Sequence, residues 1–166
     1  MTNYDEDLSV YNGHLELDIL IDRPVHDVWV QFLDLGSWIT SHRVEPVSGV
    51  PGTLGSITRV AFKKAKELGM PPAHHHYCKV IKVVPDVQYV MKTYSEQGGS
   101  YGMQMLGYDD TRFEAKSGQT KLTFNLFAEV RADFVAKDPN AMNLETSREG
   151  MLGNLNNLKR ILETRR

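Results

Sequence analysis

The chain has 166 residues, 41% of them hydrophobic, a formal net charge of −2 and a sequence pI near 6.3. This length suits one domain with a sizeable core, and the charge gives no basic excess that would attract nucleic acid or an anionic membrane. The single cysteine, Cys78, excludes an internal disulfide and is typical of a reducing compartment.

The chain also lacks obvious targeting segments. Residues 1–12 are polar and are expected to be a loosely held lead-in, and residues 1–18 contain no apolar run of the kind found in signal peptides. No apolar stretch approaches the ~18 residues of a membrane span. We therefore expect one domain over residues 1–166 of a cytoplasmic protein, either a monomer or a homodimer.

The first predicted elements are a strand and two short helices. Over residues 14–21, apolar and polar side chains alternate, which is the pattern of a half-buried strand. Pro24 fits the first position of a helix, and apolar residues follow it at helical spacing as far as Gly36, which ends the helix. Trp38 begins a second short helical piece.

Residues 42–131 are predicted to form strand after strand. We expect strands over residues 44–47, 56–62, 75–84, 87–94, 101–113 and 122–130, separated by turn residues at 48–52, 85–86, 97–99 and 117–118. Short turns join antiparallel neighbours, so the segment should form a meander. The alternation predicts that one face of this sheet meets water and the other meets helices.

A long helix is predicted to follow, from the helix-start signal at 138–139 to the last residue. Leu155, Leu158 and Leu162 lie on one apolar stripe of this helix. A twisted sheet that curls around one helix is not filled by that helix alone, so we expect an internal cavity. Gly150 and Gly153 indicate either close backbone packing or a kink, or else room for a ligand beside the helix.

These segments together resemble the START/Bet v 1-like (SRPBCC) superfamily over about residues 13–164. The resemblance is carried by the helix with Pro24, Trp29, Asp34 and Trp38, by the segments 55–60 and 80–85, and by the last helix. It implies an α+β helix-grip fold, in which a curved seven-stranded antiparallel sheet surrounds a long C-terminal helix and a deep apolar cavity. The superfamily includes hormone receptors, lipid carriers, polyketide cyclase/dehydrases, chaperone activators and oxygenase domains, so the resemblance does not imply one function.

Residues 69–72, Gly-Met-Pro-Pro, are similar to the gate loop that closes over the ligand in the abscisic-acid receptors. Counting from Gly55, His42 falls where these receptors keep a lysine that pairs with the ligand carboxylate. Asn154 falls where they keep a cavity asparagine, and Gly150 lies one turn earlier. The gate serine is missing and Cys78 stands near the receptors' cavity glutamate, so hormone binding is not implied.

The histidine run at residues 74–76 is a further candidate for chemistry. On a strand, His74 and His76 point the same way, about 6.5 Å apart, and could hold a metal together with Cys78. Because no carboxylate stands at supporting spacing, we expect no metal and no cofactor. The alternatives are polar residues beside the gate and a general acid or base at the cavity mouth. Cys78 is either a small buried hydrophobe or, with His76 as its base, a nucleophile.

The predicted function is binding of a small hydrophobic molecule, such as a lipid, an aromatic or a polyketide-like compound, between the sheet and the last helix. The residues expected to bind it are His42, Val60, Phe62, Met70, His76, Cys78, Tyr94, Leu126, Gly150 and Asn154. His42, His76 and Asn154 would be the polar anchors. The alternatives are an aromatase/cyclase-type enzyme that acts on a poly-carbonyl chain and a protein-interaction module; no catalytic residue can be named.

Overall fold

The computed structural model describes residues 13–62, 75–94, 103–130 and 144–164. The elements follow in the order β1 (Gly13–Ile21), α1 (Val25–Leu33), α2 (Leu35–Trp38), β2 (His42–Ser48), β3 (Ile57–Phe62), β4 (His75–Val84), β5 (Gln88–Tyr94), β6 (Met103–Lys116), β7 (Gln119–Val130) and α4 (Leu144–Thr164). The predicted gate at 69–72, with Met70, lies outside the described residues, as do His74 and the helix-start signal at 138–139.

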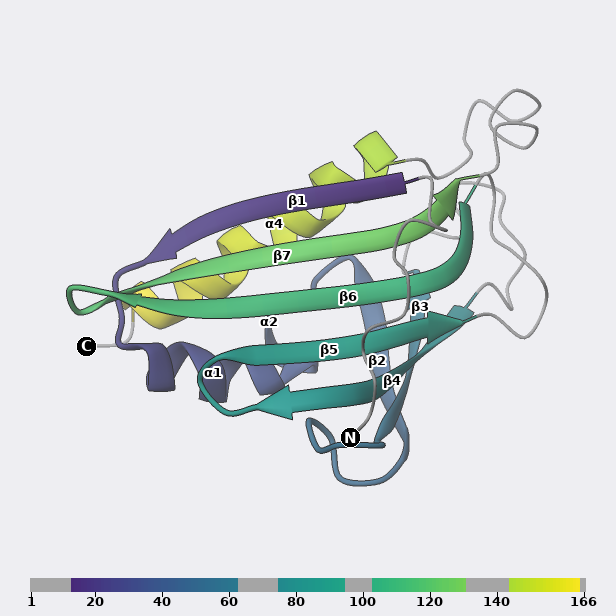
Figure 1. Ribbon diagram of the computed structural model, residues 1–166, viewed down its shortest axis with the longest axis horizontal. Coiled ribbons are helices and arrows are strands. Elements are labelled where there is room, and N and C mark those ends of the chain that lie inside the picture. The colour runs from purple at the N-terminus through teal and green to yellow at the C-terminus, as the bar shows by residue number, and fades with distance from the viewer. Residues whose placement is uncertain (1–12, 63–74, 95–102, 131–143, 165–166) are drawn as a thin grey trace.

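The strands form one seven-stranded antiparallel sheet in the order β1-β7-β6-β5-β4-β3-β2 (Figure 1). The long helix α4 runs along one face of the sheet beside β1 and β7, while α1 and α2 lie near one of its ends. The prediction of an α+β helix-grip fold is confirmed. Among the described residues, no helix is long and apolar enough to cross a membrane.

The inner face of the sheet is the face that α4 covers. Every second residue of β1 from Leu15 to Ile21 is buried there, as the alternation predicted, and β1 pairs along its whole length with β7. Leu155, Leu158 and Leu162 of α4 are buried against the same core, which confirms the apolar stripe. Burial of each leucine contributes about 1.5–3 kcal/mol, so this interface is the main attachment of α4.

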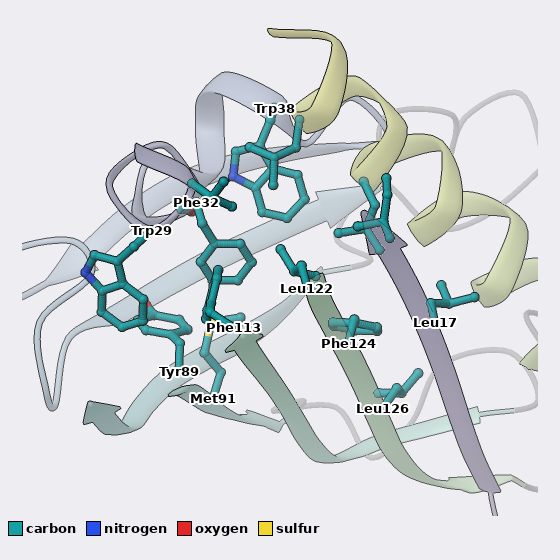
Figure 2. Close-up of a cluster of buried hydrophobic side chains, with 14 of the residues drawn as sticks. Leu17, Trp29, Phe32, Trp38, Tyr89, Met91, Phe113, Leu122, Phe124 and Leu126 are labelled. Atoms are coloured by element: carbon teal, nitrogen blue, oxygen red, sulfur yellow. Dashed lines mark hydrogen bonds between the residues drawn. The ribbon is translucent and has the colours of Figure 1, made fainter. Parts of the chain in front are cut away.

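A cluster of aromatic rings fills the end of the core next to α1 and α2 (Figure 2). The ring of Phe32 lies 5.1 Å from that of Phe113 and 5.3 Å from that of Trp38, and Trp29 meets Phe113 edge-on at 5.2 Å. The indole Nε1–H of Trp38 donates a hydrogen bond to the backbone carbonyl of Phe32, so its polar group is not left unpaired. This end of the molecule is closed by packing.

Candidate functional site

The strand register identifies the side chains that share the inner face. Directly opposed residues in an antiparallel pair point to the same side. The register pairs Val60 with His76, Cys78 with Thr93, and Asp109 with both Met91 and Leu126. Val60, Cys78, Met91 and Leu126 belong to the buried core, so this is the inner face. Four of the residues predicted for the site lie there: Val60, His76, Cys78 and Leu126.

Tyr94, also predicted for the site, points to the opposite face of the sheet, away from Val60 and Cys78. It pairs with Tyr77, and the two rings stack with their centroids 5.6 Å apart. The preceding residue, Thr93, takes the inner position and is buried, and its hydroxyl donates to the carbonyl of Gly107. Successive strand residues point to opposite faces, so a position error of one residue exchanges Thr93 for Tyr94.

Phe62 also belonged to the predicted site. Its backbone pairs with that of His42 at the end of β3, and its side chain lies outside the described part of the structure. His42 is two residues before Val44, which pairs with Val60, so His42 shares the inner face with Val60 and His76. The imidazole rings of His42 and His76 meet edge-on, with their centroids 6.0 Å apart.

Asn154 of α4 connects the helix to the start of β2. Its Oδ1 accepts hydrogen bonds from the backbone N–H of Thr40 at 2.9 Å and of Ser41 at 3.3 Å, and from the Thr40 hydroxyl at 3.2 Å. Its Nδ2 donates to Ser41 Oγ at 2.9 Å. The Asn154 side chain is 3% exposed. Two backbone donors require an oxygen opposite them, so the orientation of the amide is fixed by its partners.

The same network reaches the histidines. Ser41 Oγ lies 2.7 Å from His42 Nδ1. Because Ser41 Oγ already accepts from Asn154, its own hydroxyl proton is available to donate to Nδ1, and this places the proton of a neutral ring on Nε2. We call Asn154, Ser41, His42 and His76 the polar chain. It brings together the three predicted anchors, from α4, β2 and β4, and adds Ser41, which the sequence analysis did not single out.

Asp109 is an inner-face carboxyl that the sequence analysis missed. Its cross-strand neighbours are Met91 and Leu126, and its carboxylate makes no hydrogen bond or ion pair among the described residues. Burial raises the pKa of Asp109 to about 7. Burial, and then the nearby charge of Asp109, also raises the pKa of the Cys78 thiol, so Cys78 is a poor nucleophile near neutral pH.

The signal for Asp109 was present in the sequence. Asp109 and Asp110 are adjacent in one strand, so their side chains must point to opposite faces and one of them must face the helix side. Asp109 also keeps part of its surface accessible, although Met91 and Leu126 on either side are buried. Asp109 is therefore not completely enclosed by the described side chains around it.

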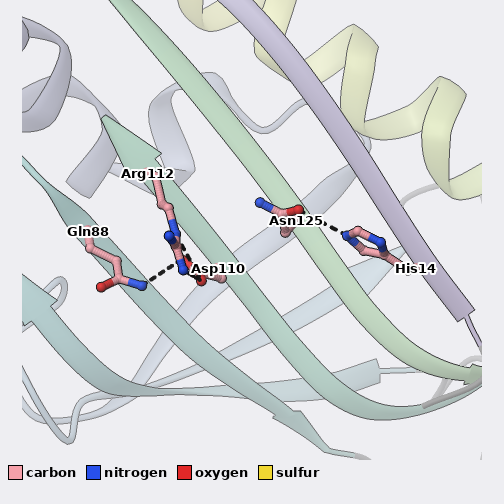
Figure 3. Close-up of polar contacts among 5 residues, drawn as sticks. All are labelled: His14, Gln88, Asp110, Arg112 and Asn125. Carbon is pink, nitrogen blue, oxygen red and sulfur yellow. Dashed lines mark hydrogen bonds and ion pairs between the residues drawn. The ribbon is translucent and has the colours of Figure 1, made fainter. Parts of the chain in front are cut away.

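Asp110 lies on the outer face, where it is fully paired (Figure 3). Its carboxylate accepts from Gln88 Nε2 at 3.0 Å and from the Arg112 guanidinium at 3.1 Å. These residues border a polar depression of about 530 Å³, which is also lined by Lys121 and Thr123 of β7. The mixed charges and its open position on the outer face distinguish it from a ligand cavity, which is mostly apolar.

Gly150 of α4 lies one turn before Asn154. A Cβ atom added at Gly150 would meet no described atom within 4 Å. The described neighbours therefore do not explain this glycine by close backbone packing. The helix has open space at Gly150, on the side that also carries Asn154.

No protein-family model matches the sequence, and no curated protein matches it. Solved structures do match, at low sequence identity. Norcoclaurine synthase from Thalictrum flavum, in complex with dopamine and hydroxybenzaldehyde, has a TM-score of 0.66 at 11% identity, over 93% of this chain and 88% of that chain.

Two other similar structures are Ara h 8.0201 and the Aha1 dimer from Colwellia psychrerythraea. Ara h 8.0201 has a TM-score of 0.64 at 14% identity, over 92% of this chain and 98% of that one. The Aha1 dimer has a TM-score of 0.64 at 16% identity, over 92% of this chain and 97% of that one. These three proteins share the architecture described above. The chain therefore has the Bet v 1-like helix-grip fold.

Proposed function

We propose that the protein binds a small hydrophobic molecule between the inner face of the sheet and α4, anchored by the polar chain. The observation that carries this proposal is the convergence of Asn154, Ser41, His42 and His76 from three separate elements. The inner face beside them is apolar and includes Val60 and Cys78. An apolar surface with a few oriented polar groups is the usual composition of a small-molecule site.

The chemistry of the polar chain favours a ligand with an acidic or hydrogen-bond-accepting group at this end. Ser41 Oγ contacts His42 Nδ1, so a neutral His42 ring carries its proton on Nε2 and presents an N–H donor there. A ligand carboxylate or enolate would favour the imidazolium. Binding of such an anion would then take up a proton and weaken as the pH rises above about 7.

The distance between His76 and Asp109 argues against a joint acid–base role for these two groups. Asp109 on β6 lies two strands away from β4 and is level with Val80 of that strand. His76 is four residues before Val80 on the same strand. At ~4.8 Å per strand and ~3.3 Å per residue, the two Cα positions are roughly 16 Å apart along the sheet. An acid and a base that act on one bond must each come within about 3 Å of it, so these two groups do not form a catalytic pair.

The first test is to identify any molecule that co-purifies with the protein, by mass spectrometry of the denatured sample. The second is fluorescence titration with anilinonaphthalene sulfonate, an anionic apolar dye, of the wild type, His42→Ala and His14→Ala. His14 is the matched control because its side chain is exposed on β1 and bonds to Asn125 (Figure 3).

We expect His42→Ala to weaken dye binding about ten- to a hundredfold, the range of a charged hydrogen bond, and His14→Ala to leave it unchanged. Equal dye affinity in the wild type and His42→Ala would remove His42 from the site. Absence of both a co-purifying molecule and dye binding in the wild type would contradict the proposal as a whole.

A further inference from the structure

The second polar position on the inner face is Asp109, which the polar chain does not include. It is held between Met91 and Leu126 on the two neighbouring strands, and Cys78 and Val80 lie one strand further away. All four neighbours are buried members of the core. An unpaired carboxyl among such neighbours loses part of its hydration without gaining a hydrogen bond, an arrangement that a core selected only for stability would avoid.

Several other polar side chains in the described residues do have hydrogen-bond partners. Asn154 is bonded to Thr40 and Ser41, Thr93 to Gly107, and Asp110 to Gln88 and Arg112. Asp109, on the inner face, has no such partner among the residues that the structure describes. Its side chain points to the inner face of the sheet, the side that α4 covers.

We propose that Asp109 is a ligand-binding residue that donates a hydrogen bond, as a neutral carboxylic acid, to an uncharged carbonyl oxygen of the bound molecule. This inference rests on the proposed function and adds the chemical class of the ligand. The ligand would be elongated and mainly apolar, because the polar chain and Asp109 are separated by roughly 16 Å along the sheet. It would carry an oxygen acceptor at the end that reaches Asp109.

The charges around Asp109 fit this role. The titratable side chains that share the inner face with it are Cys78 and Tyr89, nearer to it, and the two histidines of the polar chain, farther away. Burial raises the pKa of both Cys78 and Tyr89, so both are neutral near pH 7. No lysine or arginine in the described part of the inner face stabilises an Asp109 carboxylate, and burial favours the neutral acid up to about pH 7.

The alternative occupant of this position is a protonated amine, which would bind the carboxylate form. The two possibilities differ in the direction of proton linkage. An acceptor ligand needs protonated Asp109, so its affinity falls as the pH rises above about 7. An amine ligand needs ionised Asp109, so its affinity falls as the pH drops below about 7.

The test uses three naphthalene probes that share one apolar body. Prodan is an uncharged fluorescent naphthyl ketone, naphthylmethylamine is a cation near neutral pH, and naphthalene carries no polar group. Their dissociation constants are measured for the wild type, Asp109→Asn and Asp109→Leu between pH 5.5 and 8.5, with circular dichroism as a check on folding. Asn is the matched substitution because it keeps the size of the side chain and a hydrogen-bond donor but cannot ionise.

We expect the wild type to bind prodan more tightly at pH 5.5 than at pH 8.5, by about five- to tenfold, the value of one hydrogen bond. Asp109→Asn should bind prodan about as well as the wild type does at low pH and lose the pH dependence. Asp109→Leu should lose about five- to tenfold in prodan affinity while binding naphthalene at least as well as the wild type.

Equal prodan affinity in the wild type and Asp109→Leu, with naphthalene bound by both, would overturn the assignment of Asp109 and leave the proposed function standing. Tighter binding of naphthylmethylamine than of prodan, increasing with pH and lost in Asp109→Asn, would show an amine site and also overturn it. If the wild type binds none of the three probes, both proposals fail.

Discussion

Two adjacent aspartates in β6 experience opposite environments, because the sheet has an inner and an outer face. Asp110 on the outer face accepts hydrogen bonds from Gln88 and Arg112. Asp109 on the inner face has only apolar cross-strand neighbours, Met91 and Leu126. On the outer face, one neutral and one charged donor compensate the Asp110 carboxylate for the hydration that it loses on burial. The inner face leaves the carboxyl of Asp109 without a hydrogen-bond donor among the described residues, at a cost in stability.

The largest effect should come from the packed part of the inner face. Leu155→Ala removes a fully buried side chain of α4 and should lower the free energy of unfolding by about 2–5 kcal/mol. Urea denaturation followed by circular dichroism measures this loss. The exposed Leu152→Ala in the same helix is the control and should change stability by less than about 1 kcal/mol. A loss below about 1 kcal/mol for Leu155→Ala would contradict the packing of α4 on the sheet.

Asp109→Asn should stabilise the protein at pH 8. The folded-state pKa of Asp109 is about 7, against an ordinary value of 3.8. A group with a raised folded-state pKa contributes stability below its unfolded pKa, and this contribution is lost as the pH rises through about 7. Removing the ionisable group should therefore raise the free energy of unfolding at pH 8 by roughly 2–4 kcal/mol.

The measurement is denaturant unfolding of the wild type and Asp109→Asn at pH 4, 6 and 8. The difference between them should be small at pH 4 and grow toward pH 8. A constant difference across this range would mean that Asp109 does not titrate as an isolated buried acid.

The matching change on the outer face should have the opposite sign. Asp110→Asn replaces a carboxylate oxygen by an NH2 group beside the donors of Gln88 and Arg112. The lost charged hydrogen bonds should lower the free energy of unfolding by about 1–3 kcal/mol at pH 8. Measuring Asp110→Asn and Asp109→Asn under the same conditions tests whether the two faces of β6 differ in this way. Two changes of the same sign would show that the faces of β6 do not differ as described.

The smallest expected effect on stability is that of His42→Ala. His42 is partly exposed, so the free energy of unfolding should change by less than about 1 kcal/mol. Dye affinity should nevertheless fall as proposed above. Asn154→Ala is the contrasting variant, because it leaves the N–H groups of Thr40 and Ser41 unpaired and should cost about 1–3 kcal/mol. Equal losses for the two variants would assign His42 a structural role.

The fold could be predicted from local patterns because those patterns have local causes. The alternation in β1 and the positive φ angles of Ser117 and Gly118 in the β6–β7 hairpin depend on a few neighbouring residues. The apolar stripe of α4 likewise repeats at helical spacing. Each of these signals identifies an element without knowledge of its partners.

The site was predicted less completely because the face of a strand depends on distant pairing. The register of β6 shifts between Gln104 and Gly107, and that of β4 shifts between Val80 and Lys82. A shift of one residue reverses the face of every following side chain. The sequence alone left open which face of strand 87–94 points inward, so Tyr94 was predicted where Thr93 faces inward. It also could not identify the inward aspartate of the pair in β6. His42 and Asn154 were found through resemblance, which carries information about long-range contacts.

Two glycines should have different evolutionary histories. A Cβ atom at Gly107 would lie 1.8 Å from the backbone oxygen of Phe127, so any other residue would displace β7. At Gly150, a Cβ atom meets nothing within 4 Å among the described residues, and replacing glycine in a helix gains up to about 1 kcal/mol. Natural relatives should keep glycine at 107 and vary at 150. If the proposed function holds, the volume of the side chain at 150 in each lineage would then record how large a ligand that lineage binds.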